Sequence, residues 1–78
     1  MRPMGLGEIP TGSFAQIVSI EGDAGRLLLM GLLEGALVQV VHQAPFGGDP
    51  IAVRVRGTLI ALRRGEANFV KVVPHVVA

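Results

Sequence analysis

The chain has 78 residues, half of them hydrophobic, and it contains no cysteine. A chain of this length forms one small domain, here expected over residues 1–78, and buries only about 60% of its unfolded surface, which disfavours a deep catalytic cleft. Seven Lys and Arg residues nearly balance six Asp and Glu residues, so the net charge of +1 gives little long-range attraction to nucleic acid or anionic lipid. The absence of cysteine excludes disulfides and thiolate metal sites, and we expect a cytoplasmic location.

The N-terminal segment predicts no export signal, because residues 1–12 carry one Arg, three Gly and two Pro without a continuous apolar core. The longest apolar run, residues 27–33, contains Gly31 and is followed by Glu34. A membrane-spanning helix needs about 20 predominantly apolar residues. The run is therefore too short to cross a membrane.

The first predicted strand covers residues 15–22, in which Ile17 faces one side and Val18 and Ile20 face the other. The strand ends at a turn sequence that contains two glycines.

A short helix is predicted next, over residues 25–30. Asp23 is suited to cap its N-terminus, and Gly31 is placed to end it in the left-handed conformation. We expect Leu29 to be the most exposed residue of this helix.

Two further strands are predicted over residues 36–43 and 51–56, where apolar and polar side chains alternate. The mostly apolar face of the first strand comprises Val38, Val40 and His42. The second strand has an apolar face of Ile51, Val53 and Val55 and an opposite face that carries Arg54 and Arg56.

The C-terminal third predicts two more strands. A tight turn at residues 57–58 leads into a short strand at 59–63, residues 63–69 allow one helical turn, and a last strand at 69–73 is ended by Pro74, which has no N–H to donate. Five short strands and one or two short helices predict a mainly β fold, a small five-stranded antiparallel barrel of the SH3-like kind.

Three short motifs follow one another along this chain. The first reads Arg-Leu-x-x-x-Gly-Leu-x-x-Gly and comprises Arg26, Leu27, Gly31, Leu32 and Gly35. The second is a loop that contains Ala44, Pro45, Gly47, Pro50 and Ile51, and the third is a turn that contains Leu62, Arg63, Glu66 and Ala67. In this order they resemble the FeoA family of small ferrous-iron transport accessory proteins, over about residues 12–73. The chain departs from the family pattern at Leu29, where members often carry a charged residue, and at Glu34, where they usually carry Pro.

The resemblance implies an SH3-like barrel in the cytoplasm that acts with FeoB, a membrane ferrous-iron transporter with a cytosolic GTP-binding domain. The implied role is regulatory or related to assembly, and the protein would be peripheral to the membrane only through this partner. A similar domain occurs at the C-terminus of some iron-dependent repressors, but no helix-turn-helix precedes it here, which favours a stand-alone accessory.

The apolar segment of residues 26–35 contains too many large side chains for all of them to point inward. We expect some of its leucines to plug one end of the barrel, and Leu29, with Arg26 and Leu33, to contact a partner protein. Phe46 lies in a loop, where it either folds back onto the barrel or anchors a partner.

Arg54 and Arg56 are expected on one strand face, and Arg63 and Arg64 are close in sequence to the strand that pairs with it. These arginines form either a solvated face or a basic patch that binds an acidic partner. RNA binding would require stacking aromatic residues beside the basic groups, and the chain has no Tyr or Trp, so no nucleic-acid partner is expected. No hydroxyl lies in a nucleophile motif, and we predict that the protein is not an enzyme.

His42 and His75 are the weak candidates for a divalent transition metal, iron or zinc, because no histidine pair has metal-ligand spacing. Two alternative functions stand beside the accessory role. One is a small barrel that binds a divalent metal through histidine and carboxylates, and the other is a structural module that forms homo-oligomers through its apolar surface.

Overall fold

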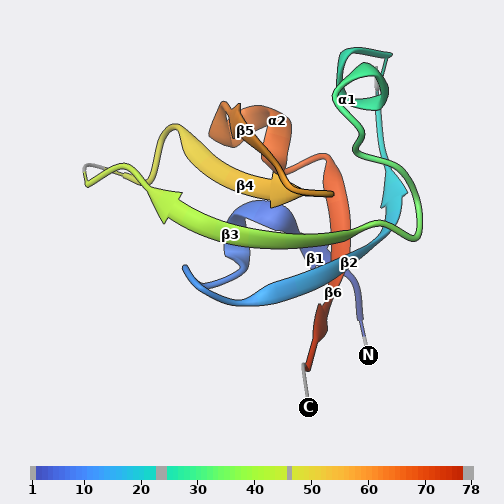
Figure 1. Cartoon of the computed structure of the whole chain (residues 1–78), viewed down its shortest axis with the longest axis horizontal. Coiled ribbons are helices and arrows are strands. Elements are labelled where there is room, and N and C mark those ends of the chain that lie inside the picture. The colour runs from blue at the N-terminus through green and yellow to red at the C-terminus, as the bar shows by residue number, and fades with distance from the viewer. Residues whose placement is uncertain (1, 23–24, 46, 77–78) are drawn as a thin grey trace.

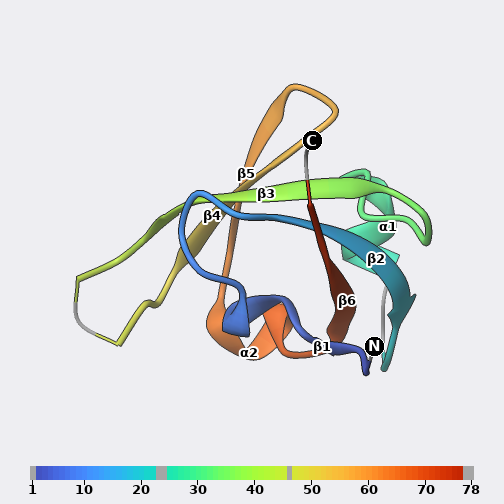
Figure 2. The ribbon, with the colours of Figure 1, turned by 90° about the horizontal axis from the view of Figure 1, so that it is seen from below.

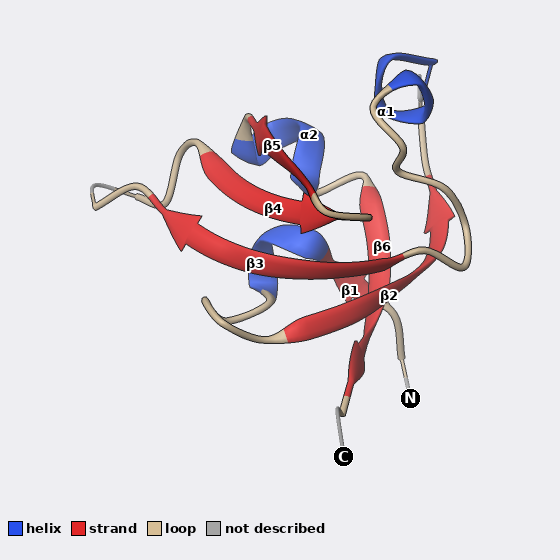
Figure 3. Ribbon diagram, viewed as in Figure 1, coloured by secondary structure: helices blue, strands red, loops and turns tan. Residues whose placement is uncertain are grey.

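The structure is a computed structural model of the chain, and it describes residues 2–22, 25–45 and 47–76. Within these ranges short strands and helical turns follow one another (Figure 1; Figure 3). Their bounds, in chain order, are β1 Met4–Gly5, the 3₁₀ helix η1 Leu6–Glu8, β2 Phe14–Ile20, α1 Gly25–Leu29, β3 Leu37–Gln43, β4 Ile51–Val55, β5 Thr58–Leu62, α2 Arg64–Ala67 and β6 Val70–His75.

The six described strands form one antiparallel sheet in the order β1-β6-β2-β3-β4-β5. The sheet curls around the core, with both α-helices on its upper side and both described chain ends on its lower side (Figure 1). In the turned view the β4–β5 hairpin projects beyond β3 (Figure 2). The predicted class, a small antiparallel barrel with short helices, is confirmed, although the sheet has six strands rather than five.

The core is made by one face of each long strand. The predicted apolar face of β4 is buried, with Ile51, Val53 and Val55 at most 2% exposed. Val38 and Val40 from β3 and Ile17 from β2 pack into the same cluster. Burying a side chain of this size contributes roughly 1.5–3 kcal/mol, so these branched apolar residues are a large favourable contribution to folding.

The additional strand, β1, belongs to an N-terminal segment that the sequence pattern did not assign to the barrel. Met4 pairs with Val72, and the 3₁₀ turn that follows places Leu6 and Ile9 in the core. A two-residue strand shows no alternation, which is why periodicity alone could not identify it.

Two β-bulges reverse the side-chain alternation that the sequence predicts. The register between β2 and β6 shifts between Ile17 and Ser19, and Ile20 consequently packs against the core rather than facing away from it. The register between β3 and β4 shifts between Val40 and His42, and His42 is exposed rather than on the apolar face. An extra residue in one strand moves every later side chain to the other face.

The structure also corrects the predicted β4–β5 turn and the predicted end of the last strand. The β4–β5 turn consists of Arg56 and Gly57, both with positive φ (52° and 82°), as a two-residue hairpin loop of this kind requires, and Thr58 already belongs to β5. Pro74 does not end the last strand, because β6 continues to His75. β1 pairs with β6 no further than Val72, so Pro74 lies where one side of β6 is an edge and an N–H is not needed.

The helix α1 is one residue shorter than predicted and ends as predicted. Gly31 has φ +94°, its N–H donates to the Leu28 carbonyl, and the Leu32 N–H donates to the Leu27 carbonyl. These two bonds form a Schellman motif, and the accompanying contact pairs two buried leucines, Leu27 and Leu32. The predicted cap, Asp23, lies outside the described residues.

Candidate partner-binding surface

The helix α1 presents apolar side chains to solvent. Leu27 is buried, whereas Leu28 is half-exposed and Leu29 is 92% exposed, the largest value among the large hydrophobic residues that the structure describes. The predicted exposure of Leu29 is therefore confirmed. Clustered exposed apolar side chains of this kind commonly mark protein interaction sites. We refer to Leu28 and Leu29, with Arg26, as the α1 surface.

An ion pair joins α1 to α2. The Arg26 Nη1 group donates to Glu66 Oε2, and the other carboxylate oxygen, Oε1, accepts the N–H of Arg63 at 3.1 Å. Glu66 therefore both caps the start of α2 and fixes the position of Arg26. The structure thus brings together residues of the first and third motifs, which lie 40 positions apart.

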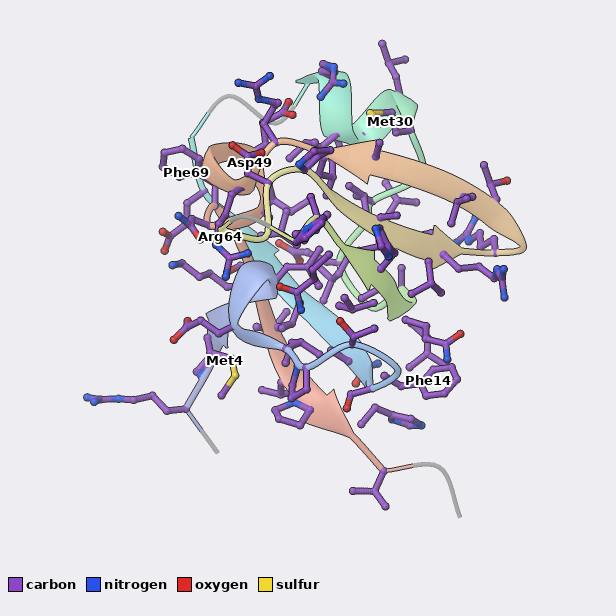
Figure 4. The ribbon with its side chains drawn as sticks, turned by 90° about the vertical axis from the view of Figure 1, so that its left-hand side faces the viewer. Met4, Phe14, Met30, Asp49, Arg64 and Phe69 are labelled. Carbon is purple, nitrogen blue, oxygen red and sulfur yellow. The ribbon has the colours of Figure 1, made fainter. Side chains whose placement is uncertain are left out.

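A groove of about 460 Å³ lies between the two helices. Its lining consists of Gly22, Arg26, Leu27, Arg63, Gly65, Glu66 and Phe69. Phe69 is 53% exposed and points outward from this side of the molecule, whereas Phe14 lies toward the opposite end (Figure 4). The lining therefore combines apolar Leu27 and aromatic Phe69 with charged side chains, and Leu29 lies on α1, the helix that supplies one side of the groove.

Phe69 was not among the predicted site residues. The signal was present in the sequence, because Val70 and Val72 alternate with Phe69 and Lys71 and are the buried set. The alternation places Phe69 on the outer side, and an exposed aromatic residue together with the exposed leucines of α1 is the kind of apolar surface that marks a contact site.

The other predicted contact residues are not gathered at this groove. Leu33 is half-buried, and Phe46 lies outside the described residues. Arg54 is exposed on the outer face of β4, opposite Leu59 of β5. Arg56 lies in the hairpin turn rather than on the strand face. The structure gives no single basic patch that includes all the arginines.

Arg64 has a structural role instead. Its guanidinium donates to the carbonyls of Gly7 (2.9 Å) and Gly48 (3.0 Å) and to the Oε1 of Gln43 (3.3 Å), and its N–H donates to Asp49. Gln43 in turn donates to the Ile9 carbonyl and to the Thr11 hydroxyl. This network, which we call the Arg64 network, ties the N-terminal turn, the β3–β4 loop and α2 together (Figure 4). Arg64 is therefore not a free group of a basic face.

The metal candidates are not brought together. His42 and His75 are both exposed, on β3 and β6, which are separated by β2. Among the residues that the structure describes, no group of three or more His, Asp or Glu side chains could hold a metal ion. In the same ranges, no helix is long and apolar enough to span a membrane.

The fold and the helix-bearing loop define a small SH3-like barrel. A family model, the FeoA domain, matches residues 4–74. The chain belongs to the FeoA family, which is associated with ferrous iron transport. The match begins at Met4, so the N-terminal strand is part of the domain rather than a segment that precedes it.

Several solved structures are similar to this chain. A FeoA-like protein from Clostridium acetobutylicum is 31% identical, with a TM-score of 0.86 over 100% of this chain and 93% of that one. FeoA from Stenotrophomonas maltophilia, a prokaryotic SH3 domain protein solved with zinc, is 35% identical, with a TM-score of 0.77 over 92% and 89% of the two chains. A manganese-dependent transcriptional repressor shares the fold (TM-score 0.83, 16% identity) over 42% of its own length. No curated protein matches the sequence.

Proposed function

We propose that this protein is a cytoplasmic, non-catalytic accessory of ferrous-iron uptake that binds the cytosolic GTP-binding domain of a FeoB-type membrane transporter. The α1 surface and the adjoining helix groove make the contact, with Leu29 and Arg26 on one side and Phe69 on the other. Leu33, Arg54 and Arg56, which do not line the groove, and Phe46 are further candidates for partner contacts.

The observation that carries this proposal is the 92% exposure of Leu29. Leu29 ends a five-residue helix in which Leu27 already supplies the buried contact, so the fold has no use for a large apolar side chain at this position. An exposed leucine on a helix that lines a groove containing Phe69 can act as a hot spot, because a partner would remove its apolar surface from water. Membership of a family associated with ferrous iron transport supports a transporter as that partner.

The test is a titration of the isotope-labelled protein with the cytosolic domain of the transporter, in its GDP form and with a GTP analogue, followed by NMR. We expect shifts at residues 26–33 and at Phe69. Leu29→Lys should weaken binding at least tenfold, about 1.4 kcal/mol, because a charge would be placed in the apolar centre of the interface.

Leu37→Lys is the matched control, since Leu37 is also an exposed leucine (43%) but lies on β3 rather than on α1. It should bind as the unmodified protein does. Equal losses in the two variants, or no shifts with either nucleotide, would remove the α1 surface from the interface.

A further inference from the structure

The two edges of the sheet differ in how they are protected against strand pairing. At one edge β1 has only two residues and is preceded by Arg2 and Pro3, and the uncovered part of β6 contains Pro74. Short strands, charges and proline are the usual devices that prevent edge pairing. At the other edge β5 pairs with β4 alone among the described strands, and residues 57–62 contain no charge and no proline.

The hairpin geometry identifies the backbone groups that β5 leaves unpaired. Because the loop has two residues, Val55 and Thr58 form the hydrogen-bonded pair that closes it, and hydrogen-bonded pairs then alternate along the ladder. Leu59 and Ala61 fall in the alternate positions. Their N–H and C=O groups therefore point away from β4, along an edge where both residues are exposed.

This edge is complementary to itself. If two copies of β5 run antiparallel about a two-fold axis at Ile60, Leu59 of one copy lies opposite Ala61 of the other. In that register all four unpaired groups of each copy meet a partner, since a hydrogen-bonded pair exchanges two bonds. The outward side chains also fit, because the 60% exposed Leu59 lies over the small Ala61 of the other copy.

We propose that β5 is a self-association edge, through which two copies of this chain pair their sheets in the antiparallel register centred on Ile60. A pairing of two five-residue strands makes a small interface, so the dimer is weak and forms at high protein concentration. The register places Gly57 opposite Arg63 of the second copy, with Arg56 beside it. Salt screens this repulsion between arginines, and the dimer is strengthened as ionic strength rises.

The proposal is tested by sedimentation velocity up to about 1 mM protein, a weak-affinity range, at low and high salt. We expect the sedimentation coefficient to rise with concentration and with salt. Leu59→Lys, which introduces the charge that natural edges carry, should abolish the rise. Leu37→Lys, the same change on a strand with neighbours on both sides, should leave it intact.

Amide hydrogen exchange in the unmodified protein gives a second readout that does not depend on any variant folding. Protection of the Leu59 and Ala61 amides should increase with protein concentration, whereas the Ile60 amide, already bonded to β4, should stay constant. A monomer at every concentration, association that survives Leu59→Lys, or concentration-independent exchange at Leu59 and Ala61 would overturn the proposal.

Discussion

The segment that carries α1 and the loop between β3 and β4 both leave the barrel and return to it, but they are held in different ways. The β3–β4 loop is tied by part-buried hydrogen bonds from Arg64 to the Gly48 carbonyl and Gln43, and by the Arg64 N–H to Asp49. The α1 segment is anchored to the core by Leu27 and Leu32, and among its described residues the side-chain link to α2 is the ion pair between Arg26 and Glu66, which are exposed or half-exposed.

The difference separates stability from recognition in this small domain. Hydrogen bonds to a charged group in a part-buried site are strong, whereas an exposed ion pair contributes little. The Arg64 network therefore stabilises the barrel, and the α1 surface is free to present Leu29, an apolar side chain that adds little to folding. Substitutions in the two regions should separate these roles.

The largest effect is expected for Arg64→Met, which keeps the aliphatic stem and removes the guanidinium. The Gly7 and Gly48 carbonyls lose their charged donor, and we expect the free energy of unfolding to fall by about 2–3 kcal/mol, measured by urea denaturation. The neighbouring Arg63→Met is the control. The Arg63 side chain is 79% exposed, and the free energy of unfolding of Arg63→Met should stay within about 0.5 kcal/mol of that of the unmodified protein. Equal losses in the two variants would show that the network does not stabilise the barrel.

The next largest loss of stability is expected from alanine substitutions at two adjacent glycines of the β3–β4 loop. Both Gly47 and Gly48 have positive φ, so alanine at either costs about 1–2 kcal/mol of backbone strain. A Cβ at Gly48 would also lie 2.6 Å from Arg64 Nη1, whereas at Gly47 it would meet nothing within 4 Å. Gly48→Ala should therefore destabilise more than Gly47→Ala by thermal unfolding.

A double-mutant cycle gives the reason for that difference. In the Arg64→Met background no guanidinium has to move, and only Gln43 Oε1, 3.0 Å from the added Cβ at Gly48, still crowds it, so the difference between the two alanine variants should shrink. An undiminished difference in this background would trace to the loop backbone rather than to the Arg64 guanidinium.

Local patterns predicted the parts of the fold that depend on one face of one element. The alternation of Ile51, Val53 and Val55 marked a buried strand face, and Gly31 marked a helix end, because burial periodicity and left-handed φ are properties of short stretches. The bulges after Ile17 and Val40 carry no comparable signature. The inward turn of Ile20 and the outward turn of His42 could not be inferred without the pairing register.

The candidate site shows the same division. The exposure of Leu29 follows from the helix pattern, since Leu27 and the Schellman contact already occupy the buried side. The Arg26–Glu66 pair and the network around Arg64 join residues far apart in the sequence. Contacts of this kind depend on how the strands cross, and no spacing in the sequence encodes them.

A smaller effect is expected from Arg26→Gln, which breaks the ion pair to Glu66 while leaving the cap on the Arg63 N–H. Exposed pairs contribute about 0.2–1 kcal/mol, and the loss should shrink further at high salt. Amide exchange should show faster opening of α1 with the β-strands unchanged. A loss that is independent of salt would indicate that the pair is part of a rigid network, and the contrast between the two regions would fail.

The smallest change in stability is expected for Leu29→Lys, the variant that should weaken partner binding most. Leu29 is 92% exposed, so removing its apolar surface alters neither the core nor the cluster around Leu27. A cation at the C-terminal end of a helix is slightly favourable, and the unfolding free energy should stay within about 0.5 kcal/mol of the original, measured by urea denaturation. A clear destabilisation would mean that Leu29 packs against the barrel in solution, and the same substitution could then no longer separate recognition from folding. Unchanged stability together with lost binding would place the recognition function on a side chain that the fold does not require.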